Sequence, residues 1–242
     1  DILDFAKIEA GKVDLENTSF SMDQLIQNVV NIVSYKIGEQ GIGFRLRKDP
    51  HVPNWFFGDP KRIEQILLNV LNNAIKFTSA GEVSLDVRLM GRENDKYHII
   101  FTVKDTGIGM TEEQVNKLFV PFEQGDSSIN RRFGGSGLGL SIVKNLLDMM
   151  GGEIEVSSAP GEGSTVILRL SLNVDKEKEA VYLKALTSEL FKRISTLVLE
   201  KSSADINLIE SYLCGFGMHC EITTSETGAL SMLEEANGKL GK

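Results

Sequence analysis

The clearest hydrophobic period in the chain lies in residues 59–78, where apolar side chains recur at helical spacing. On a wheel of 100° per residue they form one broad face, made of Ile63, Ile66, Leu67, Val70, Leu71, Ala74 and Ile75. Asp59 is a suitable N-cap, and Pro60 suits the first helical position, where a missing N–H costs nothing. The pattern therefore predicts a helix with one buried face.

The opposite face of this predicted helix carries Asn69, Asn72, Asn73 and Lys76. Asparagine is a poor helix former, and a solvated face more often carries Glu, Lys and Gln. Amide oxygens can bind Mg²⁺, and a lysine can bind phosphate. The helix alone leaves two interpretations open, a metal and phosphate site or an ordinary polar surface.

Shorter patterns on both sides predict the remaining elements. Ser21 followed by Gln24 is a capping-box pattern, and it opens a helix that residues 38–43 break. Further helices are expected at 111–118 and 138–150, and strands at 43–47, 54–57, 82–90, 97–104, 154–157 and 165–172. Because several strands follow each other as hairpins, we expect an α/β sandwich with a mixed, mainly antiparallel sheet covered by helices on one face.

Changes in pattern divide the chain into four parts. Residues 1–20 read as the end of a helix and a connector, and residues 21–172 hold the predicted sandwich. Residues 173–193 are charged and suggest a linker. Residues 194–242 show a β-α-β-α pattern that is typical of a doubly wound domain, although 49 residues are too few for an independent core.

Composition excludes several classes of protein. The 242 residues carry a formal charge of −8, and the basic residues are scattered, so we expect no nucleic-acid partner. No apolar run of 18 residues and no signal peptide is visible, so the sequence predicts no membrane span. The two cysteines, Cys214 and Cys220, fit small apolar roles in a reducing compartment.

Asp105, Gly107 and Gly109 form an Asp-x-Gly-x-Gly pattern at the end of a predicted strand. Glycines let the backbone come close to a ligand, and the aspartate can accept a hydrogen bond from a ring amino group. The same pattern also fits a tight turn capped by the aspartate. Both interpretations stay open on this pattern alone.

Residues 134–140, GGSGLGL, lead into a predicted helix. Clustered glycines before a helix can form a phosphate site from free N–H groups and the helix dipole. The long polar stretch before them excludes a Rossmann turn, and the missing Gly-Lys-Ser/Thr excludes a P-loop. Arg131 and Arg132 could reach phosphate oxygens. A flexible hinge with exposed charges is the alternative.

The order of these patterns is more specific than any one of them. The asparagine helix is followed by Asp-x-Gly-x-Gly at 105–109, Phe-x-Pro-Phe at 119–122, the glycine cluster, and Gly-x-Gly-Ser-Thr at 161–165. Residues 21–172 thereby closely resemble the catalytic ATP-binding domain of bacterial sensor histidine kinases. That family belongs to the GHKL superfamily, with gyrase, the Hsp90 chaperone and the MutL repair protein. The resemblance implies a Bergerat-type ATP-binding fold, with ATP and Mg²⁺ as cofactors.

The resemblance also implies roles for individual residues. Asn73 would hold Mg²⁺, and Asn69 and Lys76 would face the phosphates and carry the catalytic role. Asn72 would keep a structural or surface role. The lid and phosphate loop would be shaped by Gly135, Gly137, Leu138 and Gly139, together with Arg131 and Arg132.

On the base side, the resemblance places Phe77 in the wall of the nucleotide pocket and Asp105 on the adenine amino group. Gly107 and Gly109 would let the base approach, and Thr165 would lie near the adenine end.

Asn69 separates two kinds of chemistry within the superfamily. In the hydrolases, the residue one turn before the metal-binding asparagine is a glutamate that activates water. An amide cannot act as a general base at neutral pH. The resemblance therefore favours transfer of the γ-phosphoryl group of ATP to a protein histidine over hydrolysis. A nucleotide-binding pseudokinase or sensor module without transfer activity is the alternative.

The flanking segments extend the resemblance. Residues 1–12 resemble the end of a dimerisation helix, so we expect the phosphoacceptor histidine upstream, in a homodimeric protein. Residues 194–242 resemble the first part of a response-regulator receiver domain, as in hybrid kinases. Glu200-Lys201-Ser202 replaces the paired acidic residues of that family, so the receiver would be degenerate. We expect a cytoplasmic domain, with any membrane anchor upstream.

Overall fold

The structure is a computed structural model that describes residues 5, 6, 8, 10, 12–121, 137–186, 195–215 and 218–240. The chain divides into two compact units, residues 1–175 and residues 176–242. The candidate site lies in the first unit.

A seven-stranded mixed sheet forms one layer of the first unit. Its strands are β1 (Thr18–Ser21), β2 (Gly43–Lys48), β3 (Trp55–Gly58), β4 (Glu82–Glu93), β5 (Lys96–Asp105), β6 (Glu153–Ala159) and β7 (Gly163–Val174). They follow the order β1-β3-β7-β5-β4-β2, and β6 also pairs with β7. Among these pairs only β2 and β4 run parallel.

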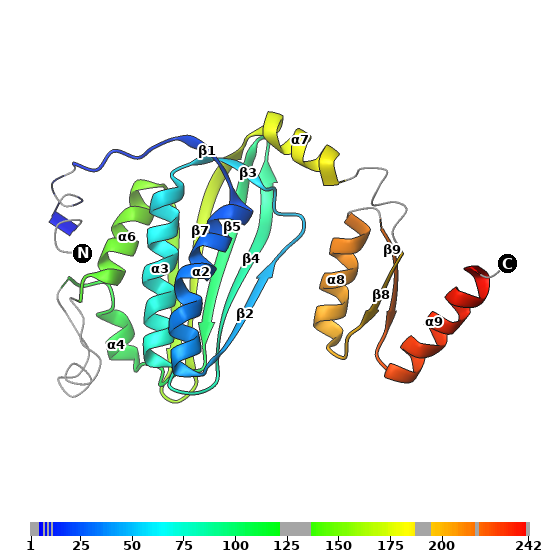
Figure 1. Cartoon of the computed structure of the whole chain (residues 1–242). Coiled ribbons are helices and arrows are strands. Elements are labelled where there is room, and N and C mark those ends of the chain that lie inside the picture. The colour runs from blue at the N-terminus through cyan, green and yellow to red at the C-terminus, as the bar shows by residue number, and fades with distance from the viewer. Residues whose placement is uncertain are drawn as a thin grey trace. The chain divides into compact units, whose positions relative to one another are not determined.

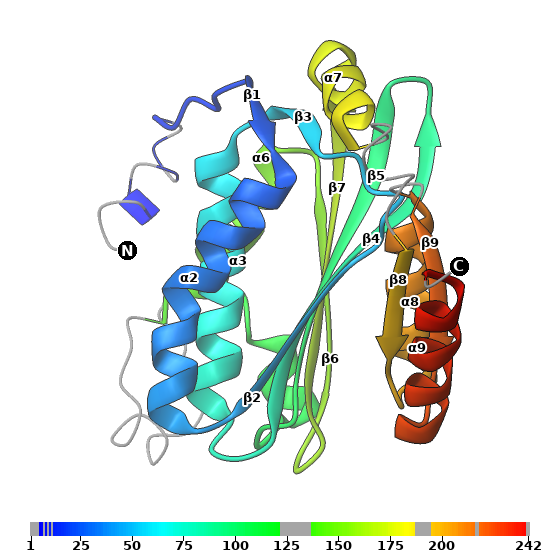
Figure 2. The same cartoon turned by 45° about the vertical axis from the view of Figure 1, so that its right-hand side comes forward.

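Helices cover one face of this sheet. They include α2 (Met22–Gln40), α3 (Pro60–Phe77) and α6 (Gly139–Met149), together with the short α4 (Glu112–Asn116). Helix α3 lies between α2 and α6, and all three lie on the same side of the sheet (Figures 1 and 2). The predicted α/β sandwich with a mixed, mainly antiparallel sheet is confirmed.

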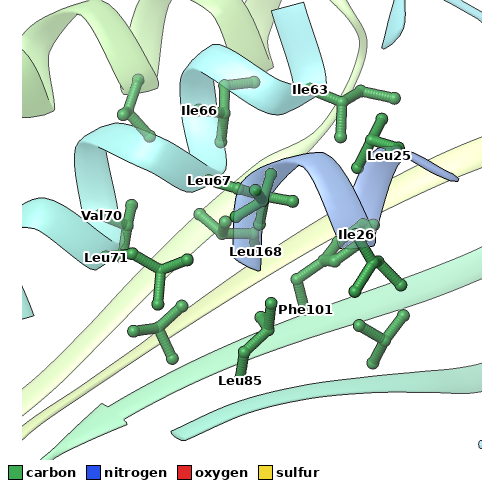
Figure 3. Close-up of a cluster of buried hydrophobic side chains, with 14 of the residues drawn as sticks. Leu25, Ile26, Ile63, Ile66, Leu67, Val70, Leu71, Leu85, Phe101 and Leu168 are labelled. Carbon is green, nitrogen blue, oxygen red and sulfur yellow. The ribbon is translucent and has the colours of Figure 1, made fainter. Parts of the chain in front are cut away.

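Helix α3 anchors the core as its pattern predicts. The seven apolar residues of the predicted face are all buried. They pack with α2 above Leu85 of β4, Phe101 of β5 and Leu168 of β7 (Figure 3). Full burial of each such side chain stabilises the fold by roughly 1.5–3 kcal/mol. The orientation of α3 is therefore fixed, and its polar face must point away from the sheet.

The caps of α2 and α3 also match the sequence prediction. Ser21 Oγ accepts the N–H of Gln24 at 3.1 Å at the start of α2. Asp59 Oδ1 accepts the N–H of Arg62 at 3.0 Å, with Pro60 in the first turn of α3. These caps set where both helices begin.

The segment that enters the first unit meets the segment that leaves it. The predicted connector ends as strand β1, which pairs with β3, and β3 also pairs with the last residues of β7. Ser19 Oγ donates a hydrogen bond to Asp175 Oδ2 at 2.5 Å, and the N–H of Asp175 donates to the carbonyl of Trp55 at 3.0 Å. Strand β1 and the end of β7 are therefore both held on β3.

The second unit contains α7 (Lys176–Leu186), β8 (Ser195–Leu199), α8 (Ser203–Gly215), β9 (His219–Thr223) and α9 (Glu226–Leu240). Strands β8 and β9 run parallel, as the predicted β-α-β-α order requires. In the described part of this unit no apolar side chain is fully buried.

Within the described ranges, no helix combines the length and the apolar character that a membrane crossing needs.

Candidate functional site

The middle of α3 faces the start of α6. Asn69, Asn73 and Lys76 are half-buried on the polar face of α3. A Cβ atom built at Gly139, the first residue of α6, would lie 3.4 Å from Asn69 Oδ1. The structure therefore places Asn69 beside the N-terminus of a second helix.

The N-terminus of α6 carries no side-chain cap from the residues that the structure describes. Its N-cap residue, Leu138, makes no side-chain cap hydrogen bond, and its side chain is fully buried. Gly137 before it has a φ of 71°, a conformation that suits glycine. The N–H groups of the first turn and the helix dipole favour negative charge at this end.

Lys76 adds a positive charge to the same face. Its Nζ lies 4.8 Å from the ring centroid of Phe77, within the range of a cation–π interaction. Burial lowers the pKa of Lys76, because desolvation disfavours the charged form. A bound anion would offset that desolvation.

Asp105 lies at the end of β5 and is buried. Its Oδ1 accepts the N–H of Gly107 at 2.8 Å and the N–H of Ser164 at 3.2 Å. Burial raises the pKa of Asp105, and the two backbone hydrogen bonds together with the side chain of Ser164 act in the opposite direction. Both backbone bonds end on Oδ1.

The turn after Asp105 requires its two glycines. A Cβ at Gly107 would lie 2.4 Å from the carbonyl oxygen of Phe77, and a Cβ at Gly109 would lie 1.9 Å from the carbonyl oxygen of Ala159. The N–H of Ile108 donates to the Phe77 carbonyl at 3.2 Å. The tight capped turn is therefore present, and it is attached to the end of α3.

Ser164 is the residue of β7 that pairs with Asp105. In the register of β5 and β7, Ser164 pairs with Asp105, and Thr165 pairs with Lys104. Successive side chains of a strand point to opposite faces, so Thr165 does not come to Asp105. The sequence analysis missed Ser164, because a Gly-x-Gly-Ser-Thr pattern does not say which of its two hydroxyls faces the helices.

Asn72 faces a different neighbour from the other two asparagines. Its Oδ1 accepts a hydrogen bond from Lys36 Nζ of α2 at 2.7 Å. A structural or surface role agrees with this contact. Of the other predicted residues, Arg131, Arg132 and Gly135 lie outside the described residues.

A pocket of about 450 Å³ lies on another part of α6. Its lining includes Phe119 and Pro121, with Phe5, Ile8, Ser141, Asn145, Asp148 and Met149. None of these is a predicted site residue. The candidate site is therefore the polar face of α3 with the turn after Asp105 and the start of α6, rather than this pocket.

The comparisons with known proteins agree with this geometry. Residues 58–174 match the family described as histidine kinase-, DNA gyrase B-, and HSP90-like ATPase. Hybrid signal transduction histidine kinase B of Dictyostelium discoideum is 41% identical over 191 residues, which are 79% of this chain and 10% of that protein. The signal transduction histidine-protein kinase BarA of Escherichia coli (strain K12) is 39% identical over 175 residues, 72% of this chain and 19% of BarA.

A third relative matches nearly all of the chain. The autoinducer 2 sensor kinase/phosphatase LuxQ of Vibrio vulnificus (strain YJ016) is 34% identical over 240 residues, 97% of this chain and 28% of LuxQ. The chain thus spans less than a third of the length of each of these relatives.

Solved structures show the same fold. Full-length ShkA, crystallised in complex with AMPPNP, has a TM-score of 0.69 and 25% identity, covering 95% of this chain and 45% of that chain. The catalytic domain of histidine kinase ThkA has a TM-score of 0.52 and 28% identity, covering 64% of this chain and 95% of that domain. Residues 58–174 of this chain therefore form a domain of the histidine kinase-, DNA gyrase B- and HSP90-like ATPase family.

Proposed function

We propose that this chain binds Mg·ATP on α3 and is the catalytic part of an ATP-dependent protein-histidine kinase. The observation that carries the proposal is that one turn and the start of one helix meet the same helix, α3. The turn after Asp105 is bonded to the carbonyl of Phe77 at the end of α3, and the start of α6 faces Asn69. Eight residues separate these points, about 12 Å along a helix, a span that suits a base at one end and phosphates at the other.

On the base side, Asp105 would accept a hydrogen bond from the amino group of adenine. The backbone N–H groups of Gly107 and Ser164 hold Oδ1, and neither of these two bonds uses Oδ2. Side chains at Gly107 and Gly109 would collide with carbonyl oxygens, so both positions lack a side chain. The backbone of the turn can therefore lie close to a flat ring. Phe77 would supply an apolar wall.

On the phosphate side, Lys76, Asn69 and the N–H groups at the start of α6 would bind the phosphates. In the part of the chain that the structure describes, no three His, Cys, Asp or Glu side chains gather in a way that could hold a metal ion. An amide-rich donor set fits Mg²⁺, which keeps several waters and takes oxygens from the phosphates. We therefore assign the metal to Asn73, and Gly135, Gly137, Arg131 and Arg132 to the phosphate loop.

The residues of the site suit phosphoryl transfer better than hydrolysis. Mg²⁺ neutralises charge on the transferred phosphoryl group when it is bound. Asn69 has no carboxylate, so it can orient a phosphate but cannot take a proton from water. Transfer then depends on positioning and charge neutralisation. The acceptor would be a histidine on a dimerisation helix outside this chain, in a homodimeric protein.

The hybrid relatives suggest the other partners. A response-regulator receiver domain would receive the phosphoryl group from the histidine, and residues 194–242 would be part of a degenerate receiver. We propose that the domain works on the cytoplasmic side of a sensor. These assignments rest on relatives that are much longer than this chain.

The test is a transfer reaction in trans. The chain is mixed with γ-labelled ATP, Mg²⁺ and a dimerisation domain that carries the acceptor histidine. We expect label on that domain, little steady-state hydrolysis, and no label with an Asn73→Ala variant. Nucleotide binding without any transfer by the full-length protein would instead support a nucleotide-binding sensor module, and rapid hydrolysis would support an ATPase.

A further inference from the structure

The β6–β7 hairpin and the turn after Asp105 are bonded together at several points. The N–H of Gly161 donates to the carbonyl of Ile108 at 2.7 Å, and the N–H of Met110 donates to Ser158 Oγ at 2.9 Å. Gly109 lies so close to the hairpin that a side chain there would overlap Ala159. The hairpin is therefore a support for the turn rather than a separate element.

Ser158 is the centre of this support. Its hydroxyl accepts the N–H of Met110, donates to the carbonyl of Gly163 at 2.9 Å, and lies 3.0 Å from Ser164 Oγ. A hydroxyl has one proton and two lone pairs, so three partners use its complete capacity. No other group in this cluster joins the turn, the hairpin and Ser164 through one atom.

The same atoms lead to Asp105. Ser158 pairs with Ser164 across β6 and β7, and Ser164 pairs with Asp105 across β7 and β5. The N–H of Ser164 donates to Asp105 Oδ1. Ser158 of β6, Ser164 of β7 and Asp105 of β5 thus form a row across three neighbouring strands, which connects Ser158 to the carboxylate.

We propose that Ser158 is a positioning residue for the base side of the site. Its hydroxyl holds the turn at Met110 and Ser164 at the carboxylate, and thereby increases the preference of the site for adenine over guanine. Guanine carries a carbonyl oxygen where adenine carries its amino group. This oxygen would face the carboxylate of Asp105, and no hydrogen bond forms between two acceptors. A carboxylate held in one place excludes guanine, whereas one that can shift tolerates it. The inference rests on the proposed ATP site.

The chain offers a matched control beside Ser158. Ser157 is exposed, and strand alternation places its side chain on the opposite face of β6. Ser157→Ala and Ser158→Ala thus remove the same hydroxyl from neighbouring residues. Ser158→Thr keeps a hydroxyl at the position and is compatible with a strand.

Two measurements on the whole chain test the proposal. The first is amide hydrogen exchange at Met110 without nucleotide, which should become about tenfold faster in Ser158→Ala and stay unchanged in Ser157→Ala. The second is calorimetric binding of ATP, GTP and inorganic tripolyphosphate. The ratio of the GTP to the ATP dissociation constant should fall about five- to tenfold in Ser158→Ala. It should recover in Ser158→Thr, and tripolyphosphate binding should not change.

Three results would overturn the proposal. They are an unchanged ratio in Ser158→Ala, the same loss in Ser157→Ala, or an equal loss of tripolyphosphate binding, which would indicate general damage. If the unaltered chain binds neither ATP nor GTP, the proposed function fails and the adenine preference fails with it. The exchange rate of Met110 then still shows whether Ser158 holds the turn, so the two failures are distinguishable.

Discussion

Gly139 and Asn69 face each other across the boundary of α6 and α3, with 3.4 Å between the position of a Cβ at Gly139 and Asn69 Oδ1. This is an ordinary van der Waals distance, and the φ of Gly139 is not positive. Glycine is therefore not needed there for the backbone. It leaves the space between the amide of Asn69 and the N–H groups of α6 open.

Replacement of Gly139 by alanine should therefore weaken ATP binding without lowering the stability of the fold. Alanine favours a helix over glycine by up to about 1 kcal/mol, so the melting temperature of the nucleotide-free chain should hold or rise in Gly139→Ala. The added methyl group intrudes beside Asn69, and ATP affinity should fall about tenfold. Calorimetry and thermal unfolding check this prediction. In Gly137→Ala, by contrast, the φ of 71° makes the backbone itself unfavourable, and stability should decrease.

The neighbouring amides Asn72 and Asn73 provide a second matched pair. Asn73→Ala should remove the magnesium-dependent part of ATP affinity, a loss of about tenfold or more. Asn72→Ala removes only an exposed contact with Lys36 and should leave affinity unchanged. The measurement is ATP binding with Mg²⁺ and with a chelator. Equal effects of the two substitutions would contradict the assignment of the metal to Asn73.

Asp105 should link pH to both stability and binding. Its pKa is raised above the ordinary value of 3.8 by burial, so the folded chain disfavours the ionised form. Above the raised pKa the folded state carries the full cost of the buried charge, and below 3.8 that cost is absent. In the nucleotide-free chain, Asp105→Asn should therefore increase the free energy of unfolding at neutral pH, and the difference should vanish as pH falls through this window.

The same substitution should weaken ATP binding. Asparagine can keep its oxygen on the two backbone N–H groups, but it then presents an NH₂ donor to the adenine amino group. The loss of a hydrogen bond to a charged group predicts about a tenfold to hundredfold lower affinity. Denaturant unfolding over a pH series and calorimetry at neutral pH check the two effects. Unchanged ATP affinity would show that Asp105 does not contact the base.

Two glycines of the β6–β7 hairpin share a positive φ, but only one of them lies in close contact with Asp105. Gly161 has a φ of 80° with open space around it, and Gly163 has a φ of 83° with a Cβ position 2.0 Å from the carbonyl oxygen of Asp105. Both alanine variants carry the cost of a positive φ, about 1–2 kcal/mol. Gly163→Ala must also displace Asp105, so it should lose more stability, and it alone should lose ATP affinity. Thermal unfolding with and without ATP checks this difference.

The periodic parts of this fold are predictable from the sequence, because burial selects them. The seven apolar positions of α3 and the cap at Asp59 are found as expected, since a 3.6-residue period has one buried face. The pairing of β2 with β4 is different, because a parallel partner can lie anywhere in the sheet. The strand β1 was expected only as an extended connector, since four residues carry no clear period.

The candidate site likewise contains residues that local patterns predict and residues whose position depends on the pairing of strands. Asn69, Asn73, Lys76 and Asp105 follow from residue chemistry at the ends and faces of regular elements. The choice between Ser164 and Thr165 depends on the register of three strands, and a shift of one residue exchanges the two faces. No pattern within the hairpin encodes that register, so the structure was needed to find Ser164 and Ser158.

The bond between Ser19 and Asp175 has a consequence for how this unit combines with others. Strand β1 and the last residues of β7 pair with neighbouring parts of β3. Any displacement of the incoming segment would also reach the outgoing one through a single strand. A shortened chain that begins at Met22 would lose both β1 and the bond from Ser19 to Asp175. Only the end of β7 would then remain attached to β3.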